Sequence, residues 1–115
     1  MGSLVGNITV DQLLGAAGVT ATGAGASARG RSGRKTYSAA GYTSAGAGAA
    51  TVQFEGSFDN VTWDTFGTIT LTLSSTPADD ANSNSFISSD NYPFVRAEVT
   101  ALSGTGATVR AARGS

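Results

Sequence analysis

Apolar and polar residues alternate along several short stretches of this 115-residue chain, most clearly at 50–57, 64–74 and 94–102. In an extended strand successive side chains point to opposite faces, so this alternation predicts strands with one buried face and one solvated face. No stretch repeats its apolar residues at the spacing of a helix. The apolar positions expected to face the core are Val52, Phe54, Ile69, Leu71, Leu73, Val95, Ala97 and Val99.

Residues that favour tight turns separate these stretches. Asp59 and Asn60 follow the first stretch, a polar segment lies at 75–85, and the glycine-rich sequence SGTGA lies at 103–107. Gly, Asn and Asp tolerate the backbone conformations that turns need. Short strands separated by frequent turns are typical of antiparallel sandwiches. We therefore expect an all-β fold, an antiparallel β-sandwich or jelly roll of about six to eight strands.

The first 34 residues differ in composition from the rest of the chain. Residues 15–34 consist mainly of small residues, and they have little apolar surface to bury. A strand candidate precedes them at residues 4–10. We expect residues 1–34 to form an extended N-terminal arm that a neighbouring subunit orders, and residues 35–115 to form the sandwich domain. Disorder of the arm and contact with nucleic acid are the alternatives, although no aromatic residue lies between its cations to stack on bases.

The composition argues against catalysis. The chain has no cysteine and no histidine, and only 13% of its residues are charged. It therefore lacks thiolates for disulfides or metal sites and imidazoles for acid–base chemistry near neutral pH. Asp59 and Asp64 flank Trp63, but acids beside a turn are usually solvated. We expect no enzymatic activity, no catalytic residue and no cofactor.

An oxygen-rich loop is the candidate metal site. Asp79, Asp80, Asn82 and Asn84 place side-chain oxygens close together along the chain, as a calcium-binding loop does. The loop lacks the glycine and the bidentate glutamate that such a site needs at the expected spacing. We therefore expect no bound metal.

Trp63 and Arg96 are the notable side chains of the expected domain. Trp63 is the only tryptophan, and it closely follows the turn at 59–60. We expect its large apolar ring to cap one end of the sandwich core, with an exposed sugar-stacking role as the alternative. Arg96 lies on the polar face of its strand beside Glu98, which indicates a surface or cross-strand ion pair, or else an interface contact.

Hydropathy and charge also bear on partners. No apolar run approaches the roughly 20 residues needed to span a bilayer, and the N-terminus lacks the basic and apolar regions of a signal peptide. We expect the protein to be made in a cytosol and to bind neither a membrane nor nucleic acid. The candidate interface residues are Arg29, Arg31, Arg34, Lys35, Trp63 and Arg96.

Two segments carry a resemblance to a known group of proteins. They read AATVQFEGSFDNVTWDTFGTITLTL at 49–73 and SSDNYPFVRAEVTALSGTGATVRA at 88–111. The turn before the tryptophan and the hairpin around SGTGA resemble those of small structural proteins of tailed bacteriophages, over residues 36–112. The same features are similar to discoidin-type sandwiches that bind sugars. This chain has no glycine after Asn60, where that turn pattern has one.

The bacteriophage resemblance implies a virion component that is made in many copies in the host cytoplasm. The function it implies is that of a capsid decoration, or cement, protein, which binds the major capsid protein or another virion protein and self-associates as a homotrimer. A carbohydrate-binding or receptor-binding module of a phage fibre is one alternative, and it predicts exposed Trp63, Tyr42 and Tyr92 on one loop rim. A neck or tail component is another.

Overall fold

The computed structural model describes residues 10–75 and 83–114, which form nine strands and no helix. The expected all-β fold is confirmed, with nine strands rather than six to eight because three short strands lie within residues 10–29. Within the described ranges, no helix is long and apolar enough to cross a membrane. The strands are β1 (Val10–Gln12), β2 (Gly23–Ala24), β3 (Ala28–Arg29), β4 (Lys35–Tyr42), β5 (Ala45–Ser57), β6 (Asp64–Leu73), β7 (Ser83–Ser88), β8 (Phe94–Thr105) and β9 (Thr108–Gly114).

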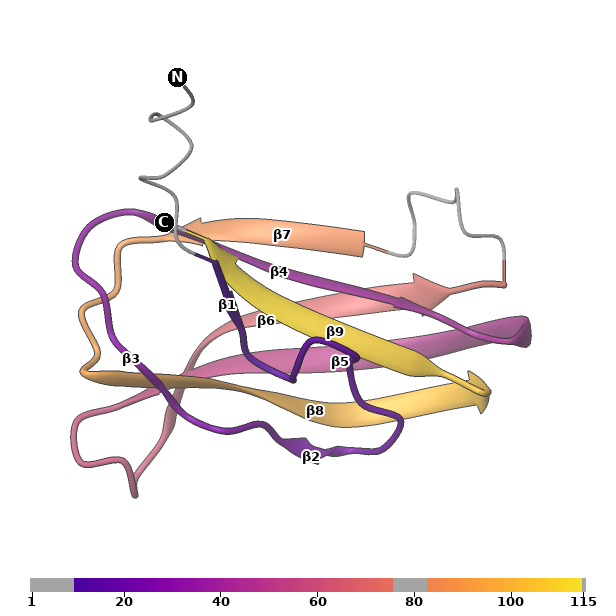
Figure 1. Cartoon of the computed structure of the whole chain (residues 1–115), viewed down its shortest axis with the longest axis horizontal. Helices are drawn as coiled ribbons and strands as arrows, with labels where there is room; N and C mark the ends of the chain where they lie inside the picture. Colours follow the sequence, from indigo (N-terminus) through magenta and orange to yellow (C-terminus); the bar gives the residue numbers. More distant parts are fainter. Residues whose placement is uncertain (1–9, 76–82, 115) are drawn as a thin grey trace.

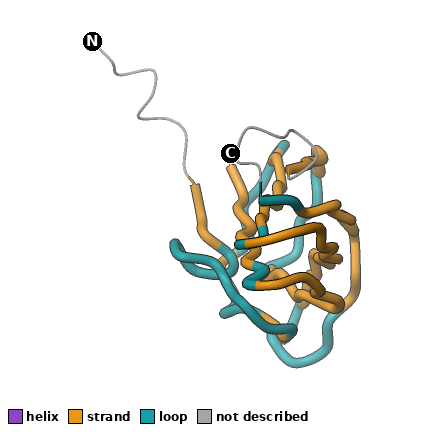
Figure 2. Tube along the Cα trace, turned by 90° about the vertical axis from the view of Figure 1, so that its right-hand side faces the viewer, coloured by secondary structure: helices purple, strands orange, loops and turns teal. Residues whose placement is uncertain are grey.

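The strands form two antiparallel sheets that pack against each other, in the orders β1-β9-β4-β7 and β2-β8-β5-β6, with β3 also paired to β8. The chain can be described as one long hairpin whose turn lies between β5 and β6. Strands at matching positions on its two arms pair with each other: β5 with β6, β4 with β7, and β1 with β9. Rolling up this hairpin brings β4 beside β9 and β5 beside β8, as in a jelly roll. Figures 1 and 2 show the resulting two layers, which confirm the expected antiparallel sandwich.

The alternating stretches lie in β5, β6 and β8, with the orientation expected from their sequences. Each of the eight apolar positions named above is at most 3% exposed. Thr68, Thr70 and Thr72, which alternate with buried residues of β6, are exposed. The period of two therefore predicted correctly which face of these three strands is buried.

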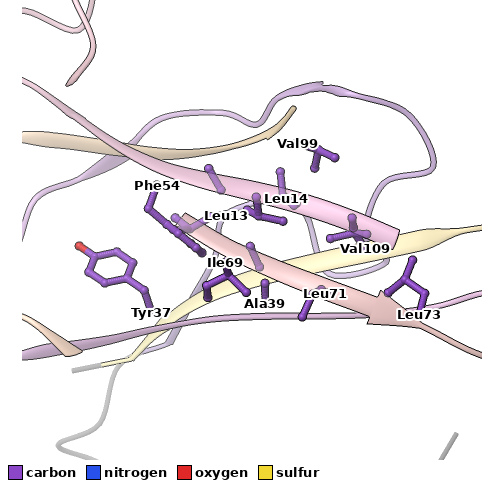
Figure 3. Packing of buried hydrophobic residues seen from close by; sticks show 14 of the residues in the cluster. Leu13, Leu14, Tyr37, Ala39, Phe54, Ile69, Leu71, Leu73, Val99 and Val109 are labelled. Atoms are coloured by element: carbon purple, nitrogen blue, oxygen red, sulfur yellow. The ribbon is translucent and has the colours of Figure 1, made fainter. Parts of the chain in front are cut away.

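Aromatic rings fill the end of the core nearest the β5–β6 connection. Tyr37, Phe54, Phe66 and Phe86 pack together, with ring centroids 5.1–6.3 Å apart in the contacting pairs. Gly67 makes room for Phe86, because a Cβ atom at that position would overlap the ring. Aliphatic side chains continue the core toward the other end of the sheets (Figure 3).

Residues 10–34, the described part of the expected arm, run along the domain, and we call them the strap. β1 extends one sheet by pairing with β9, while β2 and β3 extend the other by pairing with β8. Leu13 and Leu14 are 2% and 5% exposed and belong to the hydrophobic core (Figure 3). The strap therefore covers one side of the sandwich, and the core draws on residues before and after position 35. Residues 1–9, with most of the strand candidate at 4–10, lie outside the described residues.

Candidate functional site

Residues 57–62, the last residue of β5 and most of the β5–β6 connection, form the candidate binding site, and we call this segment the tip. It lies where the long hairpin folds back, and it projects beyond the strands at the lower left of Figure 1. Ser57 at its start lies opposite Phe94 at the start of β8. The tip thus combines a protruding position with direct support from a central strand pair.

Hydrogen bonds fix the conformation of the tip. One carboxylate oxygen of Asp59 accepts from the backbone N–H of Thr62 (2.8 Å) and of Val61 (2.9 Å), and from the hydroxyl of Ser57 (3.0 Å). These bonds favour the ionised carboxylate, so they lower the pKa of Asp59 to about 2. Asn60 has φ 61°, a left-handed conformation that asparagine tolerates. The expected Asp-Asn turn is therefore present and internally bonded.

The tip displays two apolar side chains to solvent. Phe58 is 73% and Val61 77% exposed, more than any other large apolar side chain in the described part of the chain. The Phe58 ring packs on Tyr92, with centroids 5.5 Å apart, and Tyr92 packs on Phe66 at 5.6 Å. Apolar groups that stay exposed on a fixed backbone are typical of contact surfaces.

Trp63 directly follows the tip and lies beside Arg96, outside the core. The guanidinium carbon of Arg96 is 4.3 Å from the Trp63 ring centroid, and Nε of Arg96 donates to Oε1 of Glu55 at 2.7 Å. Trp63 is half-buried and is not part of the core cluster, so the prediction that it caps the core is wrong. The aromatic cluster already fills that end of the core, while the cation of Arg96 attracts the face of the indole ring.

Lys35 is buried rather than available to a partner. It is 1% exposed, and its ammonium donates to three backbone carbonyls at 2.6–2.7 Å, those of Arg31, Gly33 and Asp90. The Asp90 carboxylate also accepts from the hydroxyl of Tyr37 at 2.9 Å. Burial, together with this bond, raises the pKa of Tyr37. A buried ammonium bonded in this way holds the end of the strap to the loop that follows β7.

A second group of charges joins the strap to β9. The Asp11 carboxylate accepts from Nε of Arg31 at 3.1 Å and from Nη2 of Arg113 at 2.6 Å. Arg113 is 1% exposed, and it also donates to the carbonyl of Arg29 at 2.7 Å. The hydrogen bonds from Arg31 and Arg113 lower the pKa of Asp11. Within residues 29–35, the exposed cationic side chains are those of Arg29 and Arg34.

Sequence reasoning missed Arg113, although the alternation pattern contains a signal for it. Arg113 follows the buried Ala111 by two residues in β9, and Lys35 precedes the buried Tyr37 by two residues in β4. Both cations therefore occupy inward-facing positions near a strand end. A charge at such a position needs a buried partner, and this requirement could have indicated both groups.

Two other expectations concern metal and sugar ligands. Among residues 10–75 and 83–114, no group of three or more acidic side chains is placed to bind a metal ion. Asp79, Asp80 and Asn82 of the oxygen-rich loop lie outside the described residues. The aromatic residues proposed for one sugar-binding rim lie at opposite ends of the sandwich, because Tyr42 ends β4 next to the start of β5, whereas Trp63 and Tyr92 lie near the end of β5.

Comparison with known proteins identifies no relative. No protein-family model, no curated protein and no solved structure matches this chain. A function is therefore inferred from the fold, the tip and the sequence motifs.

Proposed function

We propose that this protein is a non-enzymatic structural component of a virus particle, a decoration protein that binds the capsid shell of a tailed bacteriophage. The observation that supports a binding role best is the tip, which holds Phe58 and Val61 exposed on an internally bonded turn. The resemblance over residues 36–112 supports the class of particle. The jelly roll supplies a rigid base from which the tip projects.

Binding through the tip follows from its apolar surface and its fixed backbone. Covering Phe58 and Val61 would remove apolar area from water, which favours association by about 1.5–3 kcal/mol for a large side chain that becomes fully buried. Because Asp59 already fixes the turn, little backbone freedom is lost on binding. Arg96 and Glu55 form a charge pair next to the tip, and the Arg96 side chain, which is partly exposed, can contact a polar partner surface.

The proposed partner is the major capsid protein or another virion protein, and the chain also binds copies of itself. Arg29 and Arg34 are exposed on the strap and would face acidic groups of a neighbour. Exposed ion pairs of this kind contribute orientation and specificity more than affinity. The proposed location is the virion, after synthesis in the host cytoplasm.

Cosedimentation of the purified chain with empty shells of the major capsid protein tests this proposal. Phe58→Ala should weaken binding by about tenfold or more, the usual effect of losing a central aromatic contact. The matched control is Ile87→Ala, which removes another exposed apolar side chain, 61% exposed, on β7. Equal binding by wild type and Phe58→Ala would reject the tip as the contact, and failure of the wild type to bind shells would reject the decoration function.

Two alternative roles would use the same tip. Phe58 is an exposed aromatic ring, which a glycan-binding fibre module needs for stacking on sugars. Glycan-array binding that disappears in Phe58→Ala would favour that role. Immunolabelling of purified particles at the neck or tail, seen by electron microscopy, would favour a neck or tail component.

A further inference from the structure

The two sides of the sandwich differ in how their edges are covered. The strap pairs with β8 and β9 along one side. On the opposite side the outermost strands are β6 and β7, and within the described residues neither pairs with a further strand. β6 runs from Asp64 to Leu73 and is longer than β7, so it presents the longer row of unpaired backbone N–H and C=O groups.

β6 lacks the features that usually protect an edge strand. Residues 65–73 include no charged residue and no proline. The register with β5 is regular from Gly67 to Leu73, since its shift lies beyond Phe54. Threonine and isoleucine favour a pleated, extended backbone. An uncharged, regular edge of this kind readily pairs with another strand.

The sequence of β6 is complementary to itself in antiparallel pairing. When Thr70 of one copy lies opposite Thr70 of a second copy, Thr68 faces Thr72 and Ile69 faces Leu71. Residues directly opposite each other lie on the same face of a sheet, so this register joins the threonine faces and the core faces of the two copies. A shift by one residue would place threonines opposite apolar side chains. We propose that two copies of this chain pair through β6 around a two-fold axis at Thr70.

The pairing would join the β2-β8-β5-β6 sheets of two copies into one continuous sheet. Over residues 67–73 it forms about six to eight backbone hydrogen bonds. A two-fold interface of this type closes on itself, so the product is a dimer and not the homotrimer that the bacteriophage resemblance implies. The inference deepens the proposed function by naming the surface for self-association. It is tested on the isolated chain, so its failure would leave shell binding by the tip open to its own experiment.

A single introduced cysteine reports directly on this contact, because the chain has no cysteine of its own. Thr70→Cys places two cysteines opposite each other, with Cα atoms about 4.5–5.5 Å apart, which is within disulfide range. We expect light scattering to give the wild type the mass of a dimer, and mild oxidation to convert most of Thr70→Cys to a disulfide-linked dimer. The matched control is Thr100→Cys, an exposed threonine in β8, in the middle of its sheet, which should stay unlinked.

Charge substitutions test the register. The double variant Thr68→Lys, Thr72→Lys places a lysine of one copy directly opposite a lysine of the other copy. Their repulsion should raise the Kd of the dimer by about tenfold. Thr68→Glu combined with Thr72→Lys opposes unlike charges and should restore the dimer. Both positions are exposed, so both variants should keep the wild-type circular dichroism spectrum. A monomeric or trimeric wild type, cross-linking of Thr100→Cys in place of Thr70→Cys, or equal dimerisation of the two charge variants would overturn the proposal.

Discussion

The salt bridges of Asp11 provide a quantitative test of how the strap is held. Asp11→Ala removes the carboxylate that accepts from both Arg31 and Arg113. Arg113 is 1% exposed, so its charge would remain in the interior without a carboxylate partner. Breaking a buried ion pair in this way costs about 3–5 kcal/mol. The Asp11 side chain is itself 26% exposed, and water can replace part of its contribution, so we expect a loss of about 3 kcal/mol.

Urea denaturation measures this loss as a shift of the unfolding midpoint, and thermal unfolding should show a Tm lower by roughly 10 °C. The matched control is Asp64→Ala at an exposed position, which should change the free energy of unfolding by less than about 0.5 kcal/mol. Combining Asp11→Ala with Arg113→Met should recover much of the loss, because no buried charge then remains unpaired. A loss below about 1 kcal/mol in Asp11→Ala would refute the assignment of Arg113 as a buried charge that depends on Asp11.

The same pair predicts a pH dependence. The pKa of Asp11 lies below its ordinary value of 3.8 in the folded protein, so the fold favours the ionised carboxylate. Its contribution to the free energy of unfolding is therefore complete above that ordinary value, and it is lost as the pH falls through the folded pKa. The stability difference between wild type and Asp11→Ala should shrink in acid. A difference that stays constant down to about pH 2 would contradict this reasoning.

Two further predictions concern the strap and the tip. Leu13→Ala should lower the free energy of unfolding, measured in urea, by about 2–4 kcal/mol, because Leu13 is 2% exposed. The control Val10→Ala, at a 57% exposed position, should lower it by less than about 0.5 kcal/mol. Equal losses in the two variants would show that the strap contributes no core packing. Asp59→Ala should reduce the hydrogen-exchange protection of the Val61 and Thr62 amides, which donate to the Asp59 carboxylate. In the wild type this protection should persist from pH 7 to about pH 4, because the pKa of Asp59 is about 2. Unchanged protection in the variant would contradict the bonded turn.

The sandwich could be predicted because its central strands repeat a local pattern. In β6, Ile69 and Leu71 alternate with exposed threonines, and the same period orients β5 and β8. The Asp59-Asn60 turn was also visible, since those residue types bond to their own backbone locally. Features that depend on neighbours within a few residues are the ones that a single sequence reveals.

The surroundings of the charged and aromatic side chains depend on residues far away in the sequence. Lys35 is hydrogen-bonded to Asp90, and Asp11 to Arg113. No local sequence pattern links positions so far apart. Trp63 likewise contacts Arg96, which lies in β8 and far away in the sequence. The composition of residues 15–34 indicates an arm. The burial of Leu13, however, depends on β9, because the backbone N–H of Leu13 donates to the carbonyl of Ala111 in that strand.

The rolled hairpin also determines when this protein can fold during synthesis. Val10 pairs with Gly114, and β9 lies between β1 and β4 in its sheet. A growing chain can form the β5–β6 hairpin early, but β1 has no strand to join until β9 has left the ribosome. Contacts of such wide sequence separation also close slowly. The nascent chain therefore cannot complete its two sheets before β9 has been synthesised, and during that interval its apolar strands are available to chaperones or to other copies.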